Sequence, residues 1–433
     1  MEAPALPDLW AGYPVRREEV LEGYGSGMIC CRAVESGEVL LRLDLSVCWT
    51  AETARASGAL AGLGELAAEL SEATQIALHL LVVANGAAAE RFRHEHVKTM
   101  CATTTETLLD WTDEELEVLA GSKWQMVAHE MREDIIAEHA ELEEVIGDFL
   151  QTHGITQEKF LWAHKILLSR AMTFYREGGS RLMVLGPGQD MFNHSCEAVG
   201  YEDVKLETAE GKEMLVIRAF KPFGEGEQAF YSYSPASNGR LLLMGGFVVP
   251  ENPFDSVELM LTFPVNPSSA PLFQQLAEGL RSAPLADGAA VAEETQDEFL
   301  QLLPPPPERP TEAALHVRLM AKTLSDQLER VLAFLRLDEL SRSLGADDLN
   351  SDRLAASDRD ANARRRALTK LRALLQQLHG RFARSEAEDA AELAAGCADP
   401  RRARALEVLL GEKRLFRLAL QLIDEKTDTV DVA

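Results

Sequence analysis

Two short segments carry the side chains best suited to chemistry. The first is the run DMFNHS at residues 190–195, and the second holds Tyr231 and Tyr233. His194 beside Ser195 invites a hydrolase interpretation, but no GxSxG nucleophile elbow accompanies the pair, so a serine hydrolase is not predicted. A tyrosine hydroxyl in such a polar setting can orient a reacting nitrogen and offset positive charge without acting as a base. The competing interpretation is a structural knot of satisfied polar groups beside two tyrosines on one strand face.

Two weaker signals lie upstream of these segments. Gly25-Ser26-Gly27 precedes a predicted strand, where glycine lets the backbone approach a ligand closely, although a tight turn without a ligand is the commoner role of such a motif taken alone. Ser169 and Arg170 end a predicted helix over residues 160–170. An arginine there is also typical of a solvated charge at a helix C-terminus. Neither signal identifies a function alone.

In their order along the chain, these segments resemble the split SET domain of the Rubisco large-subunit lysine methyltransferase class of protein methyltransferases. The motifs are GSGMICCRAVESGE at 25–38, WAHKILLSRA at 162–171, DMFNHS at 190–195 and GEQAFYSYSPASN at 226–238. The last is the tightest match, and the DxxNHS form is also specific. A shallower match, LLGEKR at 409–414, is similar to the end of the family's helical substrate-binding domain.

The resemblance implies S-adenosylmethionine as the cofactor and a protein as the methyl acceptor. Methyl transfer is an in-line displacement, so the site must place two reactants and needs no metal or covalent nucleophile. By resemblance, the backbone at Tyr24 and Ser26 contacts the amino-acid end of the cofactor. Ser169 and Arg170 open the second SET half, where the arginine is expected to pair with the cofactor carboxylate. No metal is implied, since the cysteines of a post-SET zinc cluster are missing.

The remaining site residues also follow from the resemblance. Asn193 is expected to bind the cofactor ammonium group, the His194 backbone the adenine edge, and Asp190 to support the turn. Phe247 corresponds to the aromatic residue that packs against the adenine, and Tyr233 to the catalytic tyrosine.

The chain departs from the family pattern in the acceptor pocket. Members of this class have Asp-Tyr-Gly-Phe where this chain has MGGF at 244–247, so a pocket tyrosine falls on Gly245. The loss of a phenol predicts a wider acceptor channel, to which Tyr201 could supply a wall. Lysine is the first choice of acceptor and histidine the alternative. A SET-fold adaptor without turnover is the competing class.

The elements that must position these residues predict an α+β fold. Short strand patterns flank a long block of helical period, which indicates a SET β-fold interrupted by a helical insertion and followed by an all-α C-terminal domain. The predicted boundaries are 1–50 for the N-terminal SET half, 51–165 for the insertion, 166–263 for the C-terminal SET half with the cofactor site and catalytic tyrosine, and 264–433 for a helical substrate-binding domain. Residues 311–340 have the composition of a long helix.

Composition narrows the partners. The formal net charge of −27 argues against nucleic acid and favours a protein substrate with a basic surface, although acidity that only aids solubility fits equally well. None of the six cysteines forms a CxxC pair, and no apolar run reaches the length of a membrane span, so reduced thiols and no membrane insertion are expected. The N-terminus resembles neither a secretory signal nor a transit peptide, which predicts a cytoplasmic or nuclear monomer, or a chloroplast protein if a transit peptide is missing.

Overall fold

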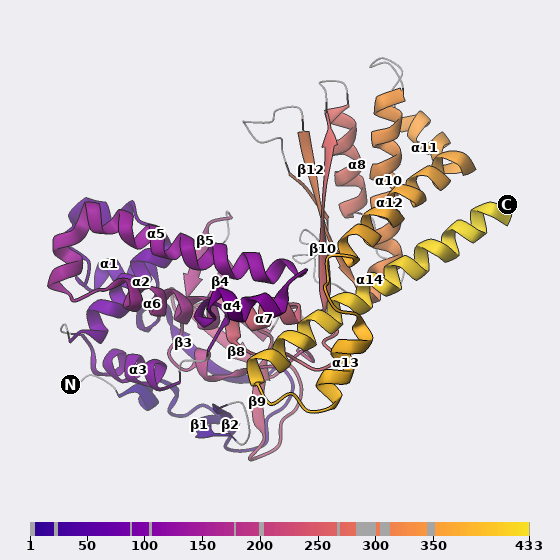
Figure 1. The fold of residues 1–433 in the computed structure, drawn as a ribbon. Coiled ribbons are helices and arrows are strands. Elements are labelled where there is room, and N and C mark those ends of the chain that lie inside the picture. The colour runs from indigo at the N-terminus through magenta and orange to yellow at the C-terminus, as the bar shows by residue number, and fades with distance from the viewer. Residues whose placement is uncertain are drawn as a thin grey trace. The chain divides into compact units, whose positions relative to one another are not determined.

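The computed structural model describes residues 5–20, 25–86, 89–103, 106–176, 179–198, 203–265, 269–282, 300–303, 312–343 and 351–432 (Figure 1). The chain forms two compact units. The first comprises residues 1–113, 126–235 and 240–247, and the second residues 114–125, 236–239 and 248–433. In the described part of the chain, no helix is long and apolar enough to cross a membrane.

A four-stranded sheet in the first unit brings distant segments together. Its order is β1 (Val15–Glu19), β2 (Ser26–Cys30), β9 (Gln228–Tyr231) and β6 (Asn193–His194). β2 runs antiparallel to β9, with Met28 opposite Ala229, and β6 runs parallel to β9, with His194 opposite Tyr231. The glycine turn, the NHS run and the tyrosine motif therefore lie on neighbouring strands.

Two smaller sheets complete the β structure of this unit. One has the order β3 (Val39–Asp44), β8 (Lys212–Arg218) and β7 (Val204–Ala209), and the other is the hairpin of β4 (Met172–Tyr175) and β5 (Arg181–Val184). Their buried side chains share one core with those of the four-stranded sheet. The strands before and after the helical block thus form one β-fold, as the sequence predicts.

Helices occupy the block between the two groups of strands. The main ones are α1 (Ala51–Ala56), α2 (Glu72–Ala84), α3 (Arg91–Ala102), α5 (Lys123–Thr152) and α6 (Gln157–Arg170), with the short α4 (Asp113–Leu116) between α3 and α5. The side chains of Thr50, Ser71 and Thr156 cap α1, α2 and α6 by accepting a backbone N–H in the first turn. α2 is buried on nearly every face, since the run from Thr74 to Val83 is apolar apart from a few polar groups.

The second unit combines helices with a sheet. The helices are α8 (Ala270–Ser282), α10 (Leu324–Ser343), α11 (Ser351–Arg359), α12 (Ala361–His379), α13 (Glu386–Ala394) and α14 (Pro400–Val432). The antiparallel sheet has the order β10 (Ser256–Pro264), β12 (Glu312–Met320) and β11 (Leu300–Leu303). The α+β class is confirmed and this region is largely helical, but it is not all-α.

β12 is the specific correction to the sequence analysis. A helix was predicted for residues 311–340, but residues 312–320 pair with β10 along nine positions. Ala313, Leu315, Val317 and Leu319 are buried on one face of this strand, which is the period of two expected for a strand. Alanine, leucine and arginine also favour helices, so local propensity misleads here and pairing with β10 decides the structure.

Candidate functional site

The predicted cofactor residues meet where β2, β9 and β6 lie side by side. The Asn193 side-chain amide donates to the Ser26 carbonyl at 3.2 Å and to Gln228 Oε1 at 3.1 Å. Gly27 lies beneath these groups, and a Cβ there would stand 2.2 Å from Gln228 Oε1. Only glycine fits this position without displacing the side chains that join β2, β6 and β9.

Tyr233 is held by the NHS segment. Its hydroxyl donates to the Phe192 carbonyl at 2.9 Å, and its backbone N–H donates to His194 Nδ1 at 3.1 Å. Burial raises the pKa of Tyr233 to about 12, so the phenol keeps its proton at neutral pH. Its ring lies 5.3 Å from that of His194 and 6.2 Å from that of Phe247. Tyr233 is therefore a fixed neutral hydroxyl beside an aromatic cluster.

His194 is a neutral structural group in this arrangement. Burial lowers its pKa to about 4. Because Nδ1 accepts the Tyr233 N–H, the ring proton lies on Nε2, which is 3.3 Å from Cys196 Sγ. A neutral imidazole committed to these contacts does not activate the neighbouring Ser195, so the geometry also gives no support to a hydrolase.

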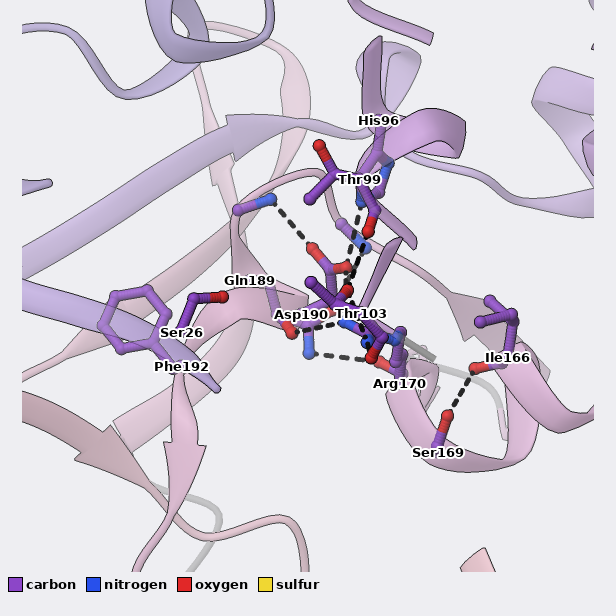
Figure 2. Close-up of polar contacts among 12 residues, drawn as sticks. Ser26, His96, Thr99, Thr103, Ile166, Ser169, Arg170, Gln189, Asp190 and Phe192 are labelled. Atoms are coloured by element: carbon purple, nitrogen blue, oxygen red, sulfur yellow. Dashed lines mark hydrogen bonds and ion pairs between the residues drawn. The ribbon is translucent and has the colours of Figure 1, made fainter. Parts of the chain in front are cut away.

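Asp190 is the buried anchor of the turn before Asn193 (Figure 2). Its side chain is 0% exposed, and its oxygens accept from Gly188 N at 3.1 Å, His96 Nε2 at 3.0 Å and Arg170 NH1 at 3.3 Å. Burial alone would raise the pKa of Asp190, but His96, Arg170 and the Gly188 N–H hold it below its ordinary value. Gly188 has φ +100° and packs against Trp10, where a Cβ would come within 2.9 Å of the indole.

Ser169 and Arg170, at the end of α6, lie near this turn but bond to protein groups (Figure 2). The Ser169 hydroxyl donates to the Lys165 carbonyl at 2.8 Å within its own helix. Arg170 NH2 donates to the Thr103 carbonyl at 2.8 Å and to its hydroxyl at 3.0 Å, while NH1 contacts Asp190. Arg170 thus links the end of α3, the turn and α6, and a cofactor contact by Ser169 or Arg170 stays a prediction.

The space beside Gly245 is filled by a ring. Gly245 ends α7 (Asn238–Gly245), and a Cβ there would stand 2.6 Å from Phe247 Cε1. At Gly246, where φ is +72°, a Cβ would meet the Glu106 carbonyl at 1.8 Å. The two glycines therefore let the chain turn sharply and bring Phe247 against the His194 ring at a centroid distance of 6.0 Å.

Two predicted site residues cannot be placed, and two residues that hold the site were not predicted from the sequence. Tyr24 and Tyr201 fall outside the described residues. His96 and Thr103, which hold Asp190 and Arg170, belong to the helical insertion and were not predicted. The available signal was a histidine on the buried face of α3, which also holds Phe92, Arg93, Val97 and Met100.

Two further motifs have structural roles within the second unit. Asn238 N donates to Asp255 Oδ1 at 2.8 Å, and Asp255 lies so close to Gly411 that a Cβ there would stand 2.2 Å from its carboxylate. Glu412 Oε1 accepts from Ser122 at 3.0 Å, and Lys413 pairs with Asp389. The SN motif at residues 237–238 and the GEK motif at residues 411–413 therefore stabilise the packing of this unit.

A cavity of about 630 Å³ lies in the helical insertion, outside the predicted site. None of the predicted site residues that the structure describes lines it. Its walls are Ser57, Gly58, Ala59, Gly62, His79, Val82, Val83, Ala89, Glu90 and His153. Its volume alone therefore does not mark the cofactor site.

Comparison with known proteins gives partial sequence matches. No protein-family model matches the chain. The chloroplastic Rubisco large subunit N-methyltransferase of Pisum sativum is 26% identical over 278 residues, which cover 57% of this chain and 52% of the relative. The chloroplastic [fructose-bisphosphate aldolase]-lysine N-methyltransferase of Arabidopsis thaliana is 27% identical over 253 residues, with coverages of 55% and 49%. The chain thus spans about half the length of the curated relatives it matches.

Solved structures match along nearly the whole chain. The SET domain of LSMT bound to methyllysine and AdoHcy has a TM-score of 0.69 at 21% identity and covers 100% of this chain and 94% of its own. Rubisco LSMT bound to AdoMet has a TM-score of 0.67 at 21% identity, with coverages of 99% and 93%. The fold of this chain is that of LSMT, and the resemblance predicted from the motifs is confirmed.

Proposed function

We propose that this chain is an S-adenosylmethionine-dependent protein N-methyltransferase whose acceptor is a lysine of a protein substrate. One observation carries the proposal. Segments far apart in the sequence converge on neighbouring strands, so that the Asn193 amide contacts the Ser26 carbonyl at 3.2 Å. Tyr233 is fixed against the same NHS segment by its bond to the Phe192 carbonyl. The fold supports this interpretation, and so do the curated relatives, one an N-methyltransferase of the Rubisco large subunit and the other an aldolase-lysine N-methyltransferase.

The groups at this convergence fit the chemistry of the cofactor. An amide and a backbone carbonyl at Asn193 and Ser26 suit an ammonium group, and the guanidinium of Arg170 suits a carboxylate. The half-buried ring of Phe247, which lies against the His194 ring, suits a flat purine. S-adenosylmethionine, when bound, supplies a sulfonium methyl group for a single displacement.

Tyr233 then acts as a neutral, oriented hydroxyl. Its raised pKa keeps the hydroxyl protonated at neutral pH, and this proton is donated to the Phe192 carbonyl. The lone pairs of the phenol oxygen remain able to accept from an incoming amine and to stabilise the positive charge near the methyl group. The acceptor lysine must enter the site as the neutral amine, because only a nitrogen lone pair can attack the methyl carbon.

Lysine is preferred over histidine as the acceptor because the Phe247 ring occupies the space that a side chain at Gly245 would take. The sequence predicts a wider acceptor pocket because a tyrosine is missing at Gly245. The Phe247 ring fills part of the space that this tyrosine would take. The missing phenol at Gly245 is the reason that histidine remains the alternative acceptor. The extensive helical region is the reason that an inactive SET-fold adaptor remains the competing class.

A basic protein surface is the proposed docking partner. The net charge of −27 supports it, and α5 adds a row of exposed carboxylates, which are Glu130, Glu133, Asp134, Glu141, Glu143, Glu144 and Asp148. Both curated relatives are described as chloroplastic, which favours the chloroplast over the cytoplasm or nucleus. We retain a monomer as the proposed assembly state.

A methyl-transfer assay tests the proposal. The protein is incubated with S-adenosylmethionine labelled in the methyl group and with a basic protein extract, and labelled residues are identified by mass spectrometry. We expect methyllysine. Methylhistidine would identify the alternative acceptor, whereas calorimetric binding of the cofactor without any labelled protein would favour the adaptor. Absence of cofactor binding would refute the enzyme and its proposed site together.

A further inference from the structure

A chain of polar contacts runs from Trp49 through His96 and Asp190 to Arg170. Figure 2 shows its part from His96 to Arg170. The Trp49 indole N–H donates to His96 Nδ1 at 2.9 Å, and His96 Nε2 lies 3.0 Å from Asp190 Oδ2. The His96 and Asp190 side chains are both 0% exposed, and Trp49 is also fully buried. Asp190 in turn contacts Arg170. The Trp49–His96 and His96–Asp190 contacts are buried, so water cannot readily replace a partner that is lost there.

The indole fixes the tautomer of His96. An indole nitrogen can only donate, so Nδ1 of His96 must be the acceptor and carry no proton. A neutral imidazole then has its proton on Nε2, which donates to Asp190. His96 is thus a donor of fixed direction, and Trp49 is the group that fixes it.

The carboxylate that receives this bond organises the turn before Asn193. Asp190 Oδ1 accepts the Gly188 N–H, and the Asp190 carbonyl also accepts from Arg170 NH1 at 3.2 Å. The next strand, β6, begins at Asn193. The direction in which Asn193 leaves the turn therefore depends on where Asp190 is held.

α3 holds both members of the Asp190–Arg170 pair. His96 on α3 binds the carboxylate, and Thr103, just after its last turn, accepts two bonds from Arg170 NH2. A helix of the insertion thus clamps the two charged residues that the sequence motifs assign to the cofactor site.

We propose that His96 is a positioning residue for the cofactor site, which holds Asp190 so that residues 186–194 and Arg170 keep the geometry needed to bind the cofactor. His96 acts through Asp190 and does not touch the reacting atoms. The part of this proposal that concerns cofactor affinity rests on the proposed function, whereas the part that concerns the turn does not.

Two substitutions of His96 distinguish the effect of its hydrogen bond to Asp190 from the effect of its packing volume. His96→Gln keeps a side-chain N–H able to reach Asp190, while His96→Leu keeps similar volume and removes the donor. His139→Leu is the matched control, because His139 is a buried histidine of α5 in the same unit and packs on Phe160 away from this network. Circular dichroism and thermal melting first establish that each variant is folded.

Amide hydrogen exchange without cofactor gives the first measurement. We expect His96→Leu to speed exchange in the peptide covering residues 186–194 by about tenfold, because the turn loses one of its anchors. His96→Gln is expected to change it little, and His139→Leu not at all. Unchanged exchange in His96→Leu would overturn the proposal whether or not the protein is a methyltransferase.

Calorimetric titration with S-adenosylmethionine gives the second measurement. The loss of a buried partner of a carboxylate predicts a Kd about tenfold or more above wild type for His96→Leu, largely restored in His96→Gln. Equal losses in the Leu and Gln variants would show that only packing matters and would overturn the role. If wild type itself fails to bind, the proposed function is refuted and the exchange measurement alone judges His96.

Trp49→Phe is a second variant that tests the proposal if His96→Leu does not fold. It removes the N–H that orients His96 and retains an aromatic ring in the core. We expect faster exchange in residues 186–194 and a Kd raised severalfold, but less than a complete loss of the His96 donor would cause. Wild-type values for both quantities would contradict the proposal.

Discussion

Glu412→Gln is expected to stabilise the second unit at neutral and alkaline pH. Glu412 is buried on α14, and its Oε1 accepts from the Ser122 hydroxyl at 3.0 Å. Burial, with a further contribution from the Asp255 carboxyl, raises the pKa of Glu412 to about 8. Glutamine has nearly the same shape, can accept the same bond from Ser122, and has no proton to lose. The substitution therefore removes the ionisation and keeps the packing.

The magnitude follows from the difference between the folded and unfolded pKa values. An unfolded glutamate has a pKa of about 4.3, so the folded state binds a proton that the unfolded state releases between about pH 4 and the folded pKa near 8. The stability contributed by this proton is fully present below about pH 4 and is lost as the pH rises to about 8. At ~1.4 kcal/mol per pKa unit, wild type has lost up to about 4 kcal/mol by pH 7. Since Asp255 shares the site, we expect a gain of about 2–4 kcal/mol for Glu412→Gln at pH 7.

Differential scanning calorimetry at pH 5 and pH 8 measures this gain. The variant should unfold at a temperature several degrees above wild type at pH 8, and the difference should shrink at pH 5. Glu425→Gln, an exposed substitution on the same helix, should show neither effect. A variant no more stable than wild type at pH 8, or a gain of equal size at both pH values, would refute the reasoning.

Three further outcomes concern the site. Tyr233→Phe should lower kcat about a hundredfold with little change in cofactor Kd. Tyr175→Phe, at a tyrosine 74% exposed, should match wild type. Retained turnover in Tyr233→Phe would contradict the catalytic assignment. Gly245→Tyr should raise the cofactor Kd, because its Cβ cannot coexist with the Phe247 ring where it stands, and calorimetry showing an unchanged Kd would place Phe247 outside the cofactor site. The single-turnover rate should rise from pH 7 to 9 for a lysine acceptor, whose free amine increases tenfold per unit below its pKa of about 10.4. A histidine acceptor, with a pKa of about 6.5, would instead give a plateau above about pH 7.5.

The amino-acid sequence carries the motifs of the site because these depend on residue type at short spacing. The run DMFNHS and the tyrosine motif around Tyr233 each lie within a short stretch of consecutive residues. The strand before Tyr233, β9, alternates half-buried and buried positions and follows a glycine turn, so local pattern was sufficient to predict it. The helix that ends at Arg170 was predicted for the same reason, and the structure places its end at that residue.

Local pattern failed where contacts between distant segments decide the outcome. Residues 312–320 became a strand because nine residues of β10 pair with them, which their helix-compatible composition does not reveal. The wider channel predicted at Gly245 stays a prediction, and what the fold adds is that the ring of Phe247 lies against this residue. Nothing in the motifs announced His96, since its partner Asp190 lies 94 residues away in the chain.

The sequence by itself therefore determined which functional groups this protein brings to its site, because side-chain chemistry and short-range spacing are encoded residue by residue. Only the tertiary structure decided which of those groups meet and in what state. It joins Asn193 to Ser26 through the shared neighbour β9, and it fixes the proton of His96 through Trp49. The physical reason is that hydrogen-bond partners, burial and the resulting pKa shifts belong to pairs of residues, and the fold alone selects the pairs.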